Sequence, residues 1–238
     1  MVNTDFDSTE YRQYIWDKEY STRKGLPSTN TTHPSTSLRM FLEKYKDINK
    51  DYALDVGCGA GRNSFYLIDN GFKHVVGIDL SQVAIDLANK ESEEKGYHNK
   101  IAFKQGDIAN ELKNVPDNSF DLIIDMMSLH AMTKWSRESV IKEVQRTLKP
   151  NGYLLIFTIT AASPAAIDLM KKYPGPEENS YRYEIAKDTI TEKAFTQEEL
   201  EKAFDKLKLI SWENVTSETK AFDNVYSRVY SNVLFKKV

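Results

Sequence analysis

Residues 53–64 read Ala-Leu-Asp-Val-Gly-Cys-Gly-Ala-Gly-Arg-Asn-Ser. The segment from Tyr52 to Val56 is short and mostly apolar, which is typical of a strand buried in a parallel sheet. The three glycines that follow permit unusual backbone dihedrals and a close approach of a ligand to the backbone. We predict that a helix follows from Asn63 to Asn70, and its first amide groups would lack internal partners and face the loop. The sequence therefore predicts a binding edge for a polar ligand.

The glycine loop differs in two ways from the fingerprint of dinucleotide-binding proteins. Counted from Gly57, the position of the third glycine in that fingerprint is taken by Arg62. Asp55 lies two residues before the first glycine, and its carboxylate would repel a pyrophosphate but attract an ammonium group. A ligand with an amino-acid end and a nucleoside end therefore fits this loop better than a ligand with phosphates.

Two further acids follow neighbouring strands. Asp79 ends a second predicted strand, 22 positions after Gly57, where a carboxylate can accept hydrogen bonds from both hydroxyls of a ribose. Asp107 follows a third predicted strand, where it could accept from the amino group of an adenine. The glycine loop and these two acids, each at the carboxyl end of a parallel strand, describe a crevice for S-adenosylmethionine.

These motifs resemble those of the class I S-adenosylmethionine-dependent methyltransferases. The match covers about residues 50–160 and consists of five motifs in order: the glycine motif from Asp55 to Gly61, Asp79, Asp107, the fourth-strand motif from Phe120 to Met126, and the fifth-strand entry from Leu148 to Leu154. Within the family, the continuation Gly-Arg-Asn-Ser is similar to the small-molecule branches of the tellurite-resistance and thiopurine type.

The resemblance implies both a fold and a cofactor site. The implied fold is α/β, a Rossmann-like doubly wound sheet of seven strands, mostly parallel with an antiparallel terminal strand, and with helices on both faces. The implied cofactor is S-adenosyl-L-methionine, with S-adenosyl-L-homocysteine as the product. Transferred onto this sequence, the cofactor contacts fall on Asp55, Gly57, Cys58, Gly59, Arg62, Asn63, Asp79, Leu80, Asp107, Ile108 and Met126.

Length and composition limit the remaining possibilities. With 238 residues the chain is long enough for one well-buried core, and we expect a methyltransferase domain over residues 49–238. A net charge of -3 argues against a general nucleic-acid binder. The single cysteine excludes an internal disulfide, and no segment resembles a signal peptide or approaches the length of a membrane span. We therefore expect a cytoplasmic monomer or homodimer with no nucleic-acid or membrane partner.

Residues 1–48 precede the predicted sheet and form an expected helical flap. Aromatic and aliphatic residues recur there at roughly helical spacing: Tyr11, Tyr14, Ile15, Trp16 and Tyr20. This stripe either packs on the core or covers the crevice, and the resemblance favours a cover, because methyltransferases of this class often close the site with such a segment. In that case Trp16 or Tyr20 would cover the sulfonium, and Arg23 would bind a carboxylate.

A second candidate lid is predicted at about residues 161–196. Several prolines and one glycine interrupt the alternation of strands and helices there, and Tyr181 and Tyr183 add amphipathic side chains that could contact a substrate. Such an insertion would lie at the carboxyl ends of the strands, where ligands bind. A capping-box pattern at Thr196 to Glu199 then opens a helix, and residues 209–215 and 225–235 are predicted strands, the second at the far edge of the sheet.

Methyl transfer is an in-line displacement that needs a well-placed acceptor and exclusion of water. Asp125 and His130, at the end of the fourth predicted strand, are the candidate catalytic residues, because either could remove a proton from the acceptor. Alternatively, Asp125 is a loop acid that is either solvated or bonded to the backbone, and His130 is a packed histidine that lines the cofactor loop. The absence of a suitable cluster of acids and amides predicts that no metal is bound.

The sequence favours a small or medium-sized acceptor that receives the methyl group on oxygen, nitrogen or a chalcogen. The run Asp125-Met126-Met127-Ser128 lacks the two prolines that often mark enzymes acting on the amino groups of nucleic-acid bases. Methylation of a base carbon through a covalent thiol would need a cysteine near the fourth strand, whereas Cys58 lies in the glycine loop. A protein side chain remains possible as acceptor. A nicotinamide-dependent oxidoreductase and a non-catalytic cofactor-binding module are the alternative functions.

Overall fold

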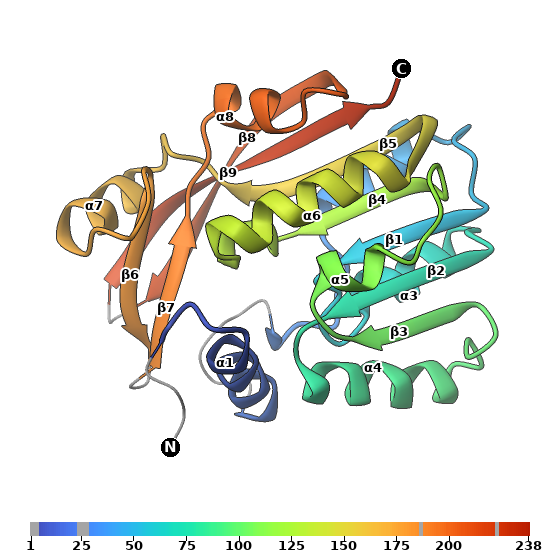
Figure 1. The fold of residues 1–238 in the computed structure, drawn as a ribbon, viewed down its shortest axis with the longest axis horizontal. Coiled ribbons are helices and arrows are strands. Elements are labelled where there is room, and N and C mark those ends of the chain that lie inside the picture. The colour runs from blue at the N-terminus through green and yellow to red at the C-terminus, as the bar shows by residue number, and fades with distance from the viewer. Residues whose placement is uncertain (1–4, 23–28, 186–187, 222–223) are drawn as a thin grey trace.

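A seven-stranded sheet lies at the centre of the molecule (Figure 1). The structure is a computed structural model that describes residues 5–22, 29–185, 188–221 and 224–238. The strands follow the order β3-β2-β1-β4-β5-β9-β8, and β9 runs antiparallel to both of its neighbours whereas β1 to β5 are parallel. The predicted doubly wound, mostly parallel sheet with an antiparallel terminal strand is therefore confirmed.

The strands of this sheet and a separate hairpin have the following bounds: β1 Tyr52–Val56, β2 His74–Asp79, β3 Ile101–Gln105, β4 Phe120–Met126, β5 Leu148–Ile159, β8 Lys208–Ala221 and β9 Asn224–Lys236, with β6 Ser180–Ile185 and β7 Asp188–Lys193 in the hairpin. The helices are α1 Thr9–Thr22, α2 Thr36–Lys44, α3 Arg62–Asp69, α4 Gln82–Glu94, α5 Ile108–Leu112, the short 3₁₀ helix η2 Leu129–Ala131, α6 Lys134–Thr147, α7 Pro164–Lys172 and α8 Gln197–Ala203.

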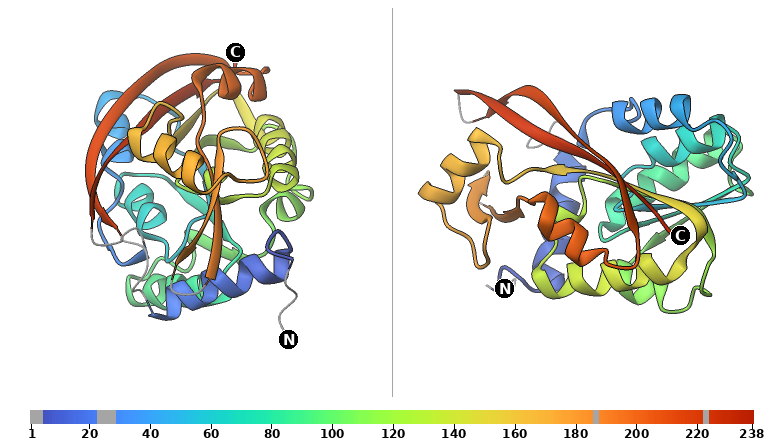
Figure 2. Two further views of the ribbon diagram at one scale, coloured as in Figure 1. Left: turned by 90° about the vertical axis from the view of Figure 1, so that its left-hand side faces the viewer. Right: turned by 90° about the horizontal axis from the view of Figure 1, so that it is seen from above.

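Helices cover both faces of the sheet because successive residues of each strand point to opposite sides (Figure 2). In β1, Leu54 and Val56 pack in a core cluster with α5, α6 and α8. Ala53 faces the other way and packs in a second cluster with α2 and α3. Because both faces are buried, β4 is buried along its whole length, as its run of apolar residues predicts.

The two C-terminal strands form a long antiparallel hairpin. The prediction that residues 225–235 lie at the far edge of the sheet is wrong, because β9 lies between β5 and β8, and β8 forms the edge. The side chains near the end of β9 explain this position. Val233 and Phe235 are buried on one face and Leu234 on the other, and a strand that is apolar on both faces belongs in the interior of a sheet.

The two helices of the predicted N-terminal flap differ in their packing. α2 places Leu38, Phe41 and Leu42 in the second core cluster, so it belongs to the packed body of the domain. α1 lies outside the sheet, below β7 and beside α4 in Figure 1, and the described core clusters contain none of its residues. Of these two helices, only α1 lies outside the packed body of the domain, as the predicted flap would.

The segment 161–196 folds as α7 followed by the β6–β7 hairpin. Tyr181 and Tyr183 are buried in a third apolar cluster together with Ile159 and Leu169. β7 also contacts η2, the short helix that follows β4. The hairpin therefore lies against the loop at the carboxyl end of β4.

Candidate active site

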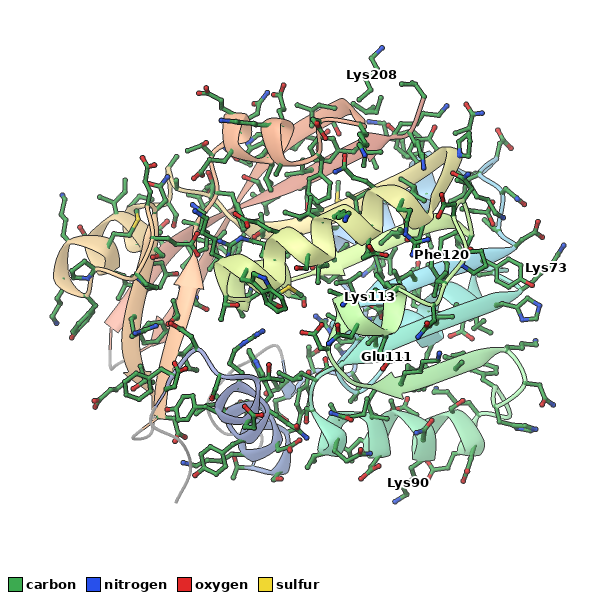
Figure 3. The ribbon with its side chains drawn as sticks, viewed as in Figure 1. Lys73, Lys90, Glu111, Lys113, Phe120 and Lys208 are labelled. Atoms are coloured by element: carbon green, nitrogen blue, oxygen red, sulfur yellow. The ribbon has the colours of Figure 1, made fainter. Side chains whose placement is uncertain are left out.

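A cavity of about 750 Å³ opens at the carboxyl ends of the parallel strands. Its walls include the glycine loop after β1, the end of β2, the loop after β4, and parts of α1, β7 and β9. The side chains of Lys73, Lys90 and Lys208 project outward from the rim of the molecule, away from the region between α1 and β7 (Figure 3). The cavity wall itself contains arginine and carboxylate side chains.

The glycine loop forms the floor of one end of the cavity. Gly57 and Gly59 have φ angles of +67° and +54°, a left-handed conformation that favours glycine. A Cβ atom at Gly57 would lie 2.2 Å from Oγ of Ser128, and one at Gly59 would lie 2.1 Å from the hydroxyl of Tyr20. Any side chain at these positions would therefore displace the loop after β4 or the helix α1.

Asp79 ends β2 beside this loop. Its Oδ2 accepts a hydrogen bond from the amide of Gly59 at 2.8 Å, and its Oδ1 accepts one from the amide of Ser81 at 2.9 Å. Burial raises the pKa of Asp79, and these backbone hydrogen bonds partly oppose the increase. The carboxylate lines the cavity and places a negative charge next to the glycine loop.

Asp55 lies beneath the loop rather than in the cavity wall. Its Oδ2 accepts a hydrogen bond from the hydroxyl of Ser64 at 2.7 Å, and within the described part of the chain its Oδ1 has no hydrogen-bond partner. Burial raises the pKa of Asp55 to about 6, although the Ser64 hydrogen bond and the charge of Arg62 lower it. Because Asp55 does not line the cavity, it can act on a ligand there through its charge rather than through a direct contact.

The beginning of α3 fixes the segment before α2 over the cavity. The guanidinium of Arg62 donates to the backbone carbonyl of His33 at 2.7 Å, and Oδ1 of Asn63 accepts from the amide of Ser35 at 2.9 Å. Both side chains also line the cavity. Arg62 and Asn63 therefore attach the backbone of residues 33–35 to the glycine loop, and this attachment forms one wall of the site.

The helix α1 covers the same end of the cavity. Trp16 and Tyr20 line it, and burial raises the pKa of the Tyr20 hydroxyl well above its usual range. Asp17 accepts hydrogen bonds from Oγ of Ser81 at 2.7 Å and from the amide of Val83 at 3.2 Å, which attaches α1 to the start of α4. On its other side, Lys18 forms an ion pair with Asp188 of β7, with a distance of 2.6 Å between Nζ and Oδ2.

The opposite end of the cavity contains a buried histidine–glutamate pair. Nε2 of His130 lies 3.3 Å from Oε1 of Glu192, and both side chains are less than a tenth exposed. Burial would raise the pKa of Glu192, but the hydrogen bond and charge of His130 and the charge of Arg228 outweigh it and lower the pKa to about 2. Glu192 is therefore ionised and holds the imidazole of His130 in place.

Three alternate residues of β9 complete this end. Arg228, Tyr230 and Asn232 all line the cavity. Sequence reasoning missed them, because it followed the other face of this strand, on which Val229, Ser231 and Val233 alternate. Glu192 was also missed. The sequence of residues 188–193 is mostly polar, so it does not indicate that one of its acidic side chains is buried. The charged and polar residues at i, i+2 and i+4 of β9 were the available signal.

Most of the predicted site residues lie together in the cavity wall, which includes Trp16, Tyr20, Gly57, Cys58, Arg62, Asn63, Asp79, Leu80, Ile108, Met126 and His130. Six other predicted residues do not line it: Asp55, Gly59, Asp107, Asp125, Tyr181 and Tyr183. Gly59 lies under the hydroxyl of Tyr20. Arg23, predicted to bind a carboxylate, lies outside the described residues.

Asp125 and Asp107 both bond to the backbone. The two carboxylate oxygens of Asp125 accept from the amides of Ser128 and Leu129 at 3.1 and 3.0 Å, and burial raises its pKa to about 7. Asp125 thereby has the loop position that was the alternative to a catalytic role. Asp107 caps α5 by accepting from the amide of Asn110 at 3.1 Å.

The described residues contain neither a group of metal ligands nor a membrane-spanning helix. Among them, no three or more His, Cys, Asp or Glu side chains are grouped as ligands for a metal ion. None of the described helices is both long enough and apolar enough to cross a lipid bilayer.

Comparisons with known proteins agree with this geometry. A methyltransferase-domain family profile matches residues 49–221. A sterol 24-C-methyltransferase of Gibberella zeae is 33% identical over 105 residues, which are 44% of this chain and 26% of that protein. A phosphoethanolamine N-methyltransferase of Plasmodium falciparum is 27% identical over 144 residues, which are 60% of this chain and 49% of that protein. The chain thus matches half or less of the length of these relatives.

A solved methyltransferase structure from Methanosarcina mazei has a similar fold. Its TM-score is 0.70 with 22% sequence identity, and the match covers 83% of this chain and 97% of that one. The family profile extends from the segment before β1 into β8, so it includes the glycine loop, Asp79 and the loop after β4. The match argues against the alternative of a nicotinamide-dependent oxidoreductase. The chain belongs to the class I S-adenosylmethionine-dependent methyltransferase family.

Proposed function

We propose that this protein transfers a methyl group from S-adenosylmethionine to a small or medium-sized acceptor that receives it on oxygen, nitrogen or a chalcogen. The observation that supports this proposal most directly is the single cavity with two different ends. Gly57, Cys58 and Asp79 follow or end β1 and β2, whereas His130, Glu192 and Arg228 come from the loop after β4, from β7 and from β9, which β4 and β5 separate from β1. The named activities of the sterol and phosphoethanolamine relatives are also consistent with a small-molecule acceptor.

The residues of the first end fit the cofactor. The glycines of the loop have no side chain, so a ligand can approach the backbone closely where a Cβ atom would otherwise lie. Asp79 has carboxylate oxygens that can accept hydrogen bonds from a ribose. The buried negative charge of Asp55 would favour a cationic ligand. When bound, S-adenosylmethionine supplies a methyl carbon that its sulfonium group activates. The protein then needs to position the acceptor and exclude water, which we assign to α1 and to the β6–β7 hairpin.

His130 is the proposed proton acceptor for a substrate that reacts as its conjugate base. Because Nε2 faces the carboxylate of Glu192, Nε2 carries the hydrogen and Nδ1 is the basic nitrogen. Nδ1 is shielded from bulk water and has no hydrogen-bond partner among the described residues. The ionised Glu192 would stabilise the imidazolium that forms when a proton moves from the acceptor to Nδ1.

We expect His130→Gln to lower kcat by about 100-fold, the usual contribution of a positioned base, with little change in cofactor affinity. Steady-state kinetics and calorimetry with S-adenosylmethionine measure the two quantities. The exposed His98 provides the control, because His98→Gln leaves the cavity unchanged. If kcat of His130→Gln equals that of the unmodified protein, His130 is only a packed residue.

We also expect the affinity for S-adenosylmethionine to rise as the pH increases from about 5 to about 7. A cationic ligand favours the ionised form of a neighbouring carboxyl group, and Asp55 has a pKa of about 6. Below this value binding requires loss of a proton, and above it no proton is lost, so the affinity levels off. Asp55→Asn should flatten the profile. Calorimetry at several pH values tests this, and an unchanged profile in the variant would exclude Asp55 as its source.

The experiment that tests the proposed function is incubation with labelled S-adenosylmethionine and a metabolite extract. We expect transfer of the label to a compound of low molecular mass, which mass spectrometry then identifies. Asp79→Ala provides the inactive control. Label found only on protein would replace the proposal by the side-chain methyltransferase, and cofactor binding without any turnover would replace it by a non-catalytic binding module.

A further inference from the structure

The end of the cavity away from the glycine loop carries an ordered row of three side chains on β9. Arg228, Tyr230 and Asn232 lie on one face of the strand and line the cavity. Because a strand rises about 3.4 Å per residue, the row extends over roughly 13 Å. The ring of Tyr230 stacks on that of Phe157, with centroids 5.0 Å apart and planes inclined by 27°. Along the strand the row thus consists of a cationic, an aromatic and a carboxamide side chain.

The carboxamide is the member of the row nearest to the loop after β4. Asn232 pairs with Phe157 of β5, and Phe157 pairs with Met126 at the end of β4. Oδ1 of Asn232 is shielded from water and has no hydrogen-bond partner in the part of the chain that the structure describes. A buried polar atom of this kind is destabilising unless a ligand supplies the missing hydrogen bond. Arg228 lies at the other end of the row, beyond the end of β5.

Arg228 is a charged group in the cavity wall, and its side chain shares a hydrogen bond with Tyr183. Among the described residues, no carboxylate oxygen lies within 4 Å of its guanidinium, and the nearby Glu192 is already engaged with His130. Burial lowers the pKa of Arg228, but the charge of Glu192 and the neighbouring tyrosines outweigh burial and raise it. The guanidinium is therefore charged, and its planar fork of five N–H groups matches the shape of an oxyanion.

We propose that Arg228 anchors an oxyanion group, a carboxylate or a phosphate, on the methyl acceptor, whose planar body lies against Tyr230. This inference rests on the proposed methyl transfer and specifies its class of substrate. The competing arrangement is a cationic acceptor bound by Glu192. It is disfavoured because Glu192 is almost fully buried and already bonded to His130, whereas the side chain of Arg228 is only partly buried in the cavity wall.

The test uses four small aromatic probes and the protein loaded with S-adenosylhomocysteine. Benzoate and phenyl phosphate carry the two kinds of oxyanion, benzyl alcohol is neutral, and benzylamine is cationic. Ligand-observed NMR at millimolar concentrations measures the affinity of each probe. We expect at least one anion to bind more tightly than the neutral and cationic probes. The tighter of the two anions identifies the oxyanion as carboxylate or phosphate.

Arg228→Gln should weaken binding of that anion by roughly 10- to 100-fold, the effect of losing a charge-assisted hydrogen-bonded pair. Arg228→Lys keeps the charge but not the fork, so we expect a smaller loss. Arg39→Gln, on the exposed side of α2, should have no effect. The affinity for S-adenosylhomocysteine should be the same in all four proteins, which shows that the variants are folded.

Three results would overturn the proposal: neither anion binds, the neutral or cationic probe binds as tightly as the anions, or Arg228→Gln binds the anion as well as the unmodified protein does. Failure of the proposed function has a different signature. In that case the unmodified protein would not bind S-adenosylhomocysteine, or it would transfer no label from S-adenosylmethionine to any acceptor.

Discussion

Asp79→Ala is expected to weaken the binding of S-adenosylmethionine by roughly 100- to 10,000-fold, because each of the two hydrogen bonds from the ribose hydroxyls to the carboxylate contributes about 1.5–3 kcal/mol. The substitution also removes the acceptor of the Gly59 amide, which helps to hold the glycine loop in its left-handed conformation. Titration calorimetry measures the change in affinity. The effect is expected on binding rather than on chemistry, so kcat at saturating cofactor should change much less.

The same substitution should leave the stability of the folded protein nearly unchanged. Burial raises the pKa of Asp79, which shows that its ionised form is disfavoured in the folded chain. Removal of the carboxylate relieves this cost while it removes two backbone hydrogen bonds. Asp86→Asn, on the exposed face of α4, is a suitable control. An unchanged affinity for S-adenosylmethionine in Asp79→Ala would contradict the assignment of the ribose site.

The sequence was sufficient to predict the parallel part of the sheet and the grouping of the glycine loop with Asp79, because both depend on local patterns. The glycine loop has to follow a buried strand, and Asp79 has to end the next one, so their positions in the chain place them at one edge of the sheet. The capping box from Thr196 to Glu199 is another local pattern, and both of its hydrogen bonds are present in the structure.

The acceptor end could not be predicted in the same way, because its residues come from elements that are distant in the chain. His130 follows β4, Glu192 lies in the β6–β7 hairpin, and Arg228 lies in β9. No spacing rule connects these positions, and residues 225–235 were predicted at the far edge of the sheet, whereas β9 lies between β5 and β8. Asp125 shows that position along the chain does not determine the partners of a side chain. It occupies the expected position at the end of β4, but its oxygens bind backbone amides.

Deletion of residues 1–30 is expected to lower kcat/KM by roughly 1000-fold or more. The loss of contacts to the cofactor can cost about 100-fold, and the loss of precise placement of the reacting groups can also cost about 100-fold. The deletion removes α1 and with it Trp16 and Tyr20 from the cavity wall. Water would then enter the site, and the hydroxyl of Tyr20 would no longer lie above Gly59. Steady-state kinetics with the acceptor found in the extract measures this loss.

The melting temperature of the truncated protein distinguishes a lost cover from a damaged core. Because the core clusters contain no residue of α1, we expect only a small decrease, due mainly to exposure of the surface under Tyr11 and Ile15. A milder variant, Asp17→Ala with Lys18→Ala, keeps the helix but removes its side-chain hydrogen bonds to the start of α4 and its ion pair with Asp188 of β7, so its kcat/KM should lie between those of the other two proteins. Full activity of the truncated chain would show that α1 is not a cover.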